Sequence, residues 1–302
     1  MPMPASILIT GGTGQLASSL EALARARGVP ALRIGRPDFD FDNPRTIAAA
    51  FQSAQPSLVI NAAAYTAVDA AETDQPAAMR ANHEGPALLA ALCRDAGVTL
   101  IHVSTDYVFD GRKGAPYVET DPTSPQGVYG ATKLAGEQAV LGSGAQAIVM
   151  RTSWVYSATG KNFVRTMLNA AGRLQDQGGG RLRVVADQTG CPTSADELAK
   201  AILNISATIL ADGWQARYGG VVHASGTGAT TWHGLAMAAF EAAARHGRPM
   251  PVVDAITTAD YPTPAPRPAD SRLDCSRLEQ VFGQSLPPWR DSVDPVVIRL
   301  LA

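Results

Sequence analysis

Lysine, cysteine and long apolar runs are all scarce in this sequence of 302 residues. Only four of the 25 basic residues are lysines, so a lysine inside a motif is informative. The three cysteines, Cys93, Cys191 and Cys275, form no C-x-x-C pair and have no histidine at metal spacing. Sparse, separated cysteines argue against a disulfide framework or a zinc site and for a reducing compartment. We therefore expect a cytoplasmic protein with no bound metal.

The features of membrane proteins and of nucleic-acid-binding proteins are missing too. No apolar run approaches the about 18 residues that a membrane helix needs. The first residues show no basic segment followed by an apolar core, so no signal peptide is expected. A net charge of −2 gives no general attraction to nucleic acid or acidic lipid. Hydrophobic residues make up 46% and charged residues 17%, a balance typical of a globular protein rather than a disordered chain.

Short apolar segments alternate with Ala-rich helical segments through the first half of the chain. The predicted strands are 5–10, 30–34, 57–61, 98–103 and 146–150. The predicted helices between them are 15–27, 45–53, 76–96 and 128–141. Such alternation is typical of parallel βαβ units, so we predict an α/β fold with a doubly wound parallel sheet.

The pattern changes beyond residue 150. Helical segments at 161–174, 195–210 and 232–246 are separated by Gly-rich loops. The segment 257–272 holds four prolines at alternate positions from 262 to 268, which exclude a regular helix or a central strand. We predict a dinucleotide-binding Rossmann domain over residues 1–150 and a smaller, mainly substrate-binding part over residues 151–302. Segments of the two parts can interleave.

A glycine turn links the first predicted strand to the first predicted helix. Its spacing is G-x-x-G-x-x-A, with Gly11 and Gly14 followed by Ala17. Glycine lets the backbone turn tightly and approach a pyrophosphate, which the free N–H groups of the helix start then bind. The spacing resembles the short-chain dehydrogenase superfamily, with Ala17 in place of a third glycine. Alanine is small enough for close packing between helix and strand. We therefore expect NADPH or NADH as the cofactor.

The residue that follows the second predicted strand bears on coenzyme choice. An acid there usually binds the ribose 2′-hydroxyl of NAD, whereas an arginine suits the 2′-phosphate of NADP. Arg36 occupies this place, and Asp38 and Asp40 follow closely. The choice between NADH and NADPH therefore stays open.

A tyrosine and a lysine four residues apart form the candidate catalytic pair. Tyr129 and Lys133 open the predicted helix 128–141 and share one of its faces. A nearby cation lowers the pKa of a tyrosine, which is near ~10 when unperturbed, and so suits it to acid–base work. Thr105 follows the strand 98–103, at an edge of the sheet where ligands bind, and could donate a hydrogen bond to a substrate carbonyl. His102 on that strand is interpreted as a packed histidine.

Longer motifs resemble one family of this superfamily, the dTDP-4-dehydrorhamnose reductases. The segments that carry the resemblance are 61–69, 104–111, 124–137, 151–156, 231–233 and 261–271. They cover nearly the whole chain. The resemblance implies reduction of the 4-keto group of dTDP-4-dehydro-L-rhamnose to dTDP-L-rhamnose, the last step in making a bacterial cell-surface sugar donor.

The resemblance also implies roles for single residues. Tyr129 would donate the proton, Lys133 would bind the nicotinamide ribose and tune Tyr129, and Thr105 would hold the keto oxygen. Asp106 and Trp154 would contact the sugar nucleotide. The residues expected to line the cofactor are Gly11, Gly14, Gln15, Leu16, Arg36, Asp40, Phe41, Ala63, Ala64, Tyr65, Val103, Tyr129 and Lys133.

Other functions on the same fold remain open. A 4,6-dehydratase would have Asp-Glu after the threonine, where this chain has Asp106-Tyr107. Another nucleotide-sugar 4-ketoreductase, an epimerase that keeps its cofactor, and a non-catalytic regulatory subunit are the alternatives, since fold alone does not prove chemistry. Some family members pair through magnesium bound partly by an acid soon after the glycine turn. This chain has Ser18-Ser19 there, so neither metal nor dimer is implied, and the assembly stays open between monomer and homodimer.

Overall fold

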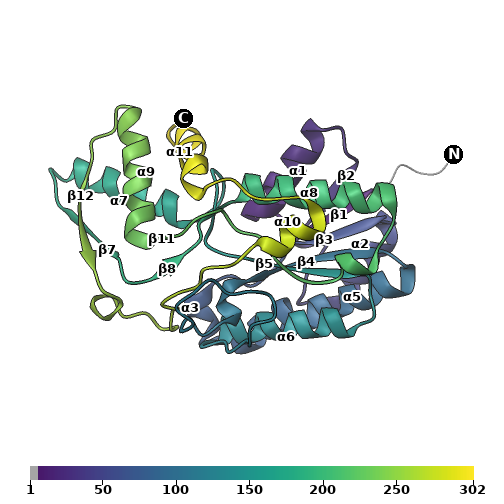
Figure 1. The fold of residues 1–302 in the computed structure, drawn as a ribbon. Helices are drawn as coiled ribbons and strands as arrows, with labels where there is room; N and C mark the ends of the chain where they lie inside the picture. Colours follow the sequence, from purple (N-terminus) through teal and green to yellow (C-terminus); the bar gives the residue numbers. More distant parts are fainter. Residues whose placement is uncertain (1–5) are drawn as a thin grey trace.

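The computed structural model describes residues 6–302, and a six-stranded parallel sheet forms the centre of this part (Figure 1). The strands lie in the order β2–β1–β3–β4–β5–β10, and every neighbouring pair is parallel. They span Ala31–Ile34, Ile7–Thr10, Leu58–Asn61, Thr99–Thr105, Ala147–Thr152 and Gly220–His223. The chain forms β2 on one side of β1 and then returns to form β3 on the other. Ligands bind outside the carboxyl ends of strands at such a reversal.

Helices cover both faces of this sheet (Figure 1). One face carries α1 (Gln15–Ala26) and α8 (Ala195–Asp212), which pack against each other. The other face carries α2 (Pro44–Ala54), α5 (Gly85–Ala96) and α6 (Val128–Gly142). Side chains alternate along each strand, so Ile7 and Ile9 of β1 belong to the first core and Leu8 to the second. Burial of both faces explains why β1 and β3 are almost continuous apolar runs.

A group of helices and a two-stranded sheet lie at one end of the molecule (Figure 1). Helices α7 (Phe163–Asp176), α9 (Trp232–Arg245) and α11 (Val293–Leu301) pack together there, α9 lying against each of the other two. β7 (Arg181–Val185) pairs in parallel with β12 (Val252–Ile256). The shorter elements are α3 (Val68–Ala71), α4 (Gln75–Met79), β6 (Val155–Tyr156), β8 (Thr189–Gly190), β9 (Thr193–Ser194), β11 (Thr230–Thr231) and α10 (Ser276–Phe282).

The predicted doubly wound parallel sheet is confirmed. The predicted helix at 76–96 is interrupted, because α4 passes through a π-helical turn, η1 (Arg80–Glu84), into α5. The first predicted strand included Ala5, which lies outside the described residues. The segment 257–272 holds one 3₁₀ turn, η4 (Thr258–Asp260), and no regular helix or strand, as its prolines predicted.

The sixth strand, β10, was not predicted. It joins the edge of the sheet beside β5, although a long stretch of chain separates the two. β10 pairs with β5, and α8 packs against α1, so both lie with elements from the first half of the chain. The division of the chain into domains near residue 150 stays a prediction. Within residues 6–302, no helix is long and apolar enough to cross a membrane.

Candidate active site

The glycine turn leaves no room for side chains. Gly11 and Gly12 have φ of +121° and +52°, a region that favours glycine. A Cβ on Gly11 would lie 3.0 Å from the backbone of Ala62 and 3.2 Å from the Cβ of Ala17. A Cβ on Gly35, after β2, would lie only 2.4 Å from the Cα of Gly12. The backbones at the ends of β1, β2 and β3 therefore meet directly, and Ala17 contacts this turn as a small residue should.

Helix α1 begins directly after the turn, with Gly14 as its N-cap and no side chain capping it. Its first N–H groups lack partners within the helix, and the helix start carries partial positive charge, so an anion fits there. The hydroxyl of Ser157 donates to Gln15 Oε1 over 2.9 Å, which ties the helix start to the loop after β6. The Leu16 side chain is buried in the core, so this residue can offer only its backbone to a ligand.

An unpredicted arginine supports the turn from β2. The guanidinium of Arg33 donates to the carbonyl oxygen of Gly12. Its Nε also pairs with Glu21 of α1 over 2.8 Å. The sequence interpretation placed weight on Arg36 and missed Arg33, which is the arginine that bonds the glycine turn.

Arg36 lies in an exposed network of charges. Its Nε pairs with Asp40 over 2.8 Å, and its Nη2 pairs with Asp42 over 2.6 Å. Arg80 also pairs with Asp42, at 2.6 Å, and its hydrogen bond holds the pKa of Asp42 below the usual value. Both Asp40 and Arg36 were predicted to line the cofactor. The structure brings the two side chains together, but they form an ion pair with each other.

Phe41 is buried rather than open to solvent. A Cβ on Gly85, the first residue of α5, would lie 1.9 Å from the Phe41 ring, so only glycine fits beneath that ring. The ring also meets Phe39 edge to face, with centroids 5.4 Å apart. The predicted contact of Phe41 with the cofactor stays a prediction.

The loop after β3 is fixed by a residue that the sequence interpretation missed. Asn82, in the π-helical turn, is fully buried. Its Oδ1 accepts from the N–H of Tyr65 over 2.8 Å, and its Nδ2 donates to the Tyr65 carbonyl and to the Thr132 hydroxyl, both over 3.1 Å. Asn82 thus links the Ala63–Tyr65 loop to α6. An asparagine inside a predicted helix was the available signal, because asparagine is unfavourable there.

Thr105 and Tyr129 meet at the carboxyl end of β4. The Thr105 hydroxyl donates to Oδ1 of Asp106 over 3.1 Å and accepts from the N–H of Tyr107 over 3.2 Å. Burial raises the pKa of Tyr129 to about 12, while a hydrogen bond with Thr105 lowers it and the charge of Asp106 raises it further. Tyr129 is therefore protonated at neutral pH. A lowering of its pKa by Lys133 stays a prediction.

Lys133 is buried beside this pair. Its Nζ donates to the carbonyl oxygen of Val103 over 2.7 Å, and its side chain is 2% exposed. Burial lowers the pKa of Lys133 to about 8, and the charge of Glu137 raises it. His102 is fully buried with its Nδ1 2.9 Å from Asn61 Nδ2, so its interpretation as a packed histidine is confirmed.

Tyr107 stands where a dehydratase would have a glutamate. Its ring meets the ring of Tyr129 edge to face, with centroids 5.4 Å apart. Gly130 allows this approach, since a Cβ there would lie 2.2 Å from the Tyr107 carbonyl oxygen. An aromatic ring, rather than a glutamate, therefore lies against Tyr129.

Asp106 and Trp154 were predicted to contact the sugar nucleotide. Burial raises the pKa of Asp106 to about 6, although the nearby hydroxyls of Ser271, Thr105 and Ser153 act in the opposite direction. Trp154 has φ of +47° and stacks on Trp232, with centroids 3.5 Å apart and planes 5° from parallel. Contact of either residue with a sugar nucleotide stays a prediction.

Two of the sequence motifs meet through an ion pair. Arg267, in the proline-rich segment, binds both carboxylate oxygens of Asp69, at 2.9 and 2.8 Å. The same segment crosses Gly111, whose Cβ would lie 2.7 Å from Pro268. The proline-rich segment is thereby held over the end of the sheet that carries Thr105.

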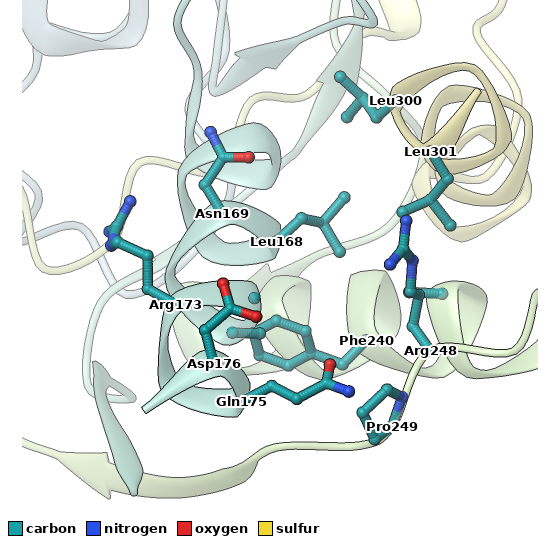
Figure 2. Close-up of a pocket in the computed structure, with 13 residues that line it drawn as sticks. Leu168, Asn169, Arg173, Gln175, Asp176, Phe240, Arg248, Pro249, Leu300 and Leu301 are labelled. Atoms are coloured by element: carbon teal, nitrogen blue, oxygen red, sulfur yellow. The ribbon is translucent and has the colours of Figure 1, made fainter. Parts of the chain in front are cut away.

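A cavity of about 400 Å³ lies apart from these groups, between α7, α9 and α11 (Figure 2). Leu168, Phe240 and Leu300 line its apolar part, and Arg173 and Arg248 lie at its rim. None of the predicted site residues lines it. Among residues 6–302, no group of three His, Cys, Asp or Glu side chains is placed to hold a metal ion.

Residues 5–301 match the family model described as the RmlD substrate binding domain. The chain belongs to the RmlD family. It is 45% identical to a dTDP-4-dehydrorhamnose reductase of Sinorhizobium fredii, over 98% of this chain and 97% of that protein. It is also 39% identical to the enzyme of that name in Escherichia coli, over 95% of each chain. The predicted family resemblance is confirmed.

Solved structures of RmlD family members have the same fold. A dTDP-4-dehydrorhamnose reductase from Bacillus anthracis, solved in complex with NADP, superposes with a TM-score of 0.88 at 30% identity, covering 98% of this chain and 99% of that one. The enzyme from Clostridium acetobutylicum gives 0.87 at 33% identity, covering 98% and 100%. A UDP-glucose 4-epimerase from Thermus thermophilus gives 0.78 at 21% identity, which shows the fold alone.

Proposed function

We propose that this RmlD family member uses NADPH or NADH to reduce dTDP-4-dehydro-L-rhamnose to dTDP-L-rhamnose. The observation that supports the proposal most is the meeting of Thr105, Tyr129 and Lys133 at one end of β4. Those three residues and the glycine turn favour a carbonyl reductase in general. The particular substrate is favoured by the names of the relatives, one of which is 45% identical to this chain.

The residues around the glycine turn fit a dinucleotide. Gly11 and Gly12 have no side chains to cover their backbone, and they lie beside the uncapped start of α1, where a pyrophosphate would bind. Ala63 and Ala64 offer small side chains after β3, over which a flat ring can lie. Lys133 would hold the nicotinamide ribose. The bound dinucleotide supplies a hydride to the substrate carbon.

The side chains supply the proton and stabilise charge. As the carbonyl carbon is reduced, its oxygen gains negative charge, which hydrogen bonds from Thr105 and Tyr129 stabilise. Tyr129, whose pKa is about 12, is protonated at neutral pH and donates its hydroxyl proton to that oxygen. Lys133, whose pKa is about 8, is mostly charged at neutral pH and stabilises the phenolate left behind.

Asp106 would contact the dTDP-sugar by hydrogen bonds between its carboxyl group and the sugar hydroxyls. Trp154 would contact it through the flat face of its indole. The three cysteines are unpaired in the described part of the chain, which favours a cytoplasmic protein. The geometry favours neither a monomer nor a homodimer.

The test follows NAD(P)H absorbance with a panel of 4-keto nucleotide sugars, with products identified by NMR. We expect dTDP-4-dehydro-L-rhamnose to be reduced with the highest kcat/KM of the panel. Faster reduction of another sugar would indicate a different 4-ketoreductase. Interconversion of sugars without net oxidation, with cofactor retained through purification, would indicate an epimerase. No turnover with any sugar would indicate a regulatory subunit.

A further inference from the structure

Two neighbouring strands, β4 and β5, present polar side chains to one carboxylate on α6. Ser104 of β4 lies opposite Arg151 of β5, which in turn lies opposite His223 of β10. Glu137 of α6 accepts from the Ser104 hydroxyl over 2.5 Å. It also accepts from Arg151, with Nε 2.9 Å from Oε1 and Nη2 2.7 Å from Oε2. One side chain of α6 is thus bonded to two strands at once.

This ion pair is buried, with side chains 2% exposed for Glu137 and 4% exposed for Arg151. A buried pair persists only when its geometry is good and its remaining polar atoms are satisfied. Here Arg151 also lies over the ring of Phe109, 5.0 Å from the centroid. Burial lowers the pKa of His223 to about 3, so this neighbour is neutral at neutral pH. The pair therefore balances its own charge.

The same face of α6 carries the candidate catalytic residues. Tyr129, Lys133 and Glu137 follow one another at four-residue steps, so they lie on one face of the helix. The charged or titratable groups near Lys133 are Tyr129 and Glu137 of α6 and His102 of β4, and burial keeps His102 neutral by holding its pKa well below the usual value. The carboxylate of Glu137 is the group that raises the pKa of Lys133, against the effect of burial.

We propose that Glu137 is a positioning residue for the reaction. It fastens the face of α6 that carries Tyr129 and Lys133 to β4 and β5, and its charge keeps Lys133 protonated. Arg151 is the counter-ion that lets this charge stay buried. The kinetic part of this inference rests on the proposed function, whereas the charge on Lys133 can be measured without substrate.

The scarcity of lysine allows a direct measurement. Protein labelled with ¹³C at the lysine ε-carbon gives signals from only four lysines, and Lys133→Met identifies the signal of Lys133. Lys133 should titrate with a midpoint near its pKa of about 8 in the wild type. In Glu137→Gln the midpoint should fall, by an amount on the order of one pH unit, because a nearby opposite charge is removed. The matched control Glu241→Gln removes a surface carboxylate, paired with Arg290, and should leave the midpoint unchanged.

Enzyme kinetics provide the second readout. Because Lys133 loses its proton at lower pH in Glu137→Gln, the basic limb of the kcat/KM profile should move to lower pH by a similar amount. A purely structural role would lower activity at every pH and leave the limb in place. An unshifted Lys133 midpoint together with an unshifted limb, in folded Glu137→Gln, would overturn the proposal.

Glu137→Gln leaves Arg151 buried without a counter-ion, which destabilises proteins. If the single variant does not fold, Glu137→Gln combined with Arg151→Met removes both charges. The double variant should again titrate Lys133 below the wild-type midpoint, with a smaller shift because a cation is also gone. A wild-type midpoint there would overturn the proposal as well. If wild-type protein reduced no sugar, the proposed function would fail while the lysine titration still tested the role of Glu137.

Discussion

The candidate active site at the end of β4 and the exposed rim after β2, made of Arg36, Asp40 and Asp42, hold their charged groups in different ways. At β4, Lys133 is 2% exposed and its Nζ bonds a backbone carbonyl. At the rim, the Arg36 side chain is 66% exposed and pairs with Asp40 and Asp42. Buried groups have few alternative partners, so their positions are fixed by the fold. Exposed pairs in water contribute little and exchange partners readily.

This difference separates what each region can do. The buried region can set pKa values and fix a reacting atom, because burial and specific partners dominate there. The exposed rim can discriminate between coenzymes only if a phosphate displaces the carboxylates that Arg36 now binds. Substitutions should therefore have large effects on chemistry at β4 and α6, and smaller, selective effects at β2.

The largest effect is expected at Tyr129. Tyr129→Phe should lower kcat by roughly 10²–10⁴, the usual contribution of a positioned acid. Cofactor affinity should hardly change, because the ring remains. Steady-state kinetics and a fluorescence titration with NADPH measure the two quantities. Near-full activity of Tyr129→Phe with dTDP-4-dehydro-L-rhamnose would remove Tyr129 as the proton donor.

Lys133→Met should have two effects. Loss of the ammonium should weaken NAD(P)H binding, because the ribose loses its partner. It should also move the basic limb of the activity profile to higher pH, because the titration of Lys133 is then gone and only that of Tyr129, whose pKa is about 12, remains. Glu137→Gln is predicted to move that limb the opposite way, so the pair of variants tests charge rather than packing. A limb that stays in place in Lys133→Met would show that Lys133 does not tune Tyr129.

Much of the buried region could be predicted from the sequence because short spacings on rigid elements determine it. Tyr129 and Lys133 lie one helical turn apart, so their proximity follows from the helix alone. Thr105 was identified because ligands bind at the carboxyl ends of parallel strands. Glu137 and Asn82 could not be identified in this way. Their partners, Arg151 and Tyr65, come from segments whose proximity depends on the complete sheet.

The exposed rim was harder to predict for a physical reason. Arg36 was identified from its place after β2, but its ion pairs with Asp40 and Asp42 depend on the path of the loop. The strand β10 was missed because its short sequence gains stability only by pairing with β5. Local patterns therefore predicted the elements and the motif residues, and tertiary contacts determined the rest.

Arg36→Ala tests whether Arg36 in the exposed rim binds the 2′-phosphate of NADPH. Charge-assisted hydrogen bonds contribute about 1.5–3 kcal/mol, so NADPH affinity should fall roughly 10- to 100-fold. NADH, which lacks the phosphate, should be hardly affected. The matched variant Asp42→Asn should act in the opposite direction, because it releases the Arg36 guanidinium from one of its carboxylates. The measurement is kcat/KM for both coenzymes in the wild type and in each variant. Equal losses for NADPH and NADH in Arg36→Ala would contradict a phosphate contact.

A smaller effect is expected at Trp154, which is partly buried. Trp154→Ala should raise the KM for the sugar nucleotide several-fold, by about the 1 kcal/mol typical of one stacking contact. Trp232→Ala serves as the control, because it removes the partner of the same stack. A similar fall in Tm for both variants with no change in KM for Trp154→Ala would assign Trp154 to the core alone.

The proposed reaction depends on hydride transfer to the sugar carbon at this site. The most direct measurement incubates the protein with dTDP-4-dehydro-L-rhamnose and NADPH deuterated at the hydride position, and then analyses the sugar by NMR. We predict dTDP-L-rhamnose with one deuterium at C4 for each NADPH oxidised, and at least a hundredfold slower labelling in Tyr129→Phe, within the range expected for loss of an acid. Unlabelled product, label at another carbon, or equal labelling rates in the two proteins would contradict the account.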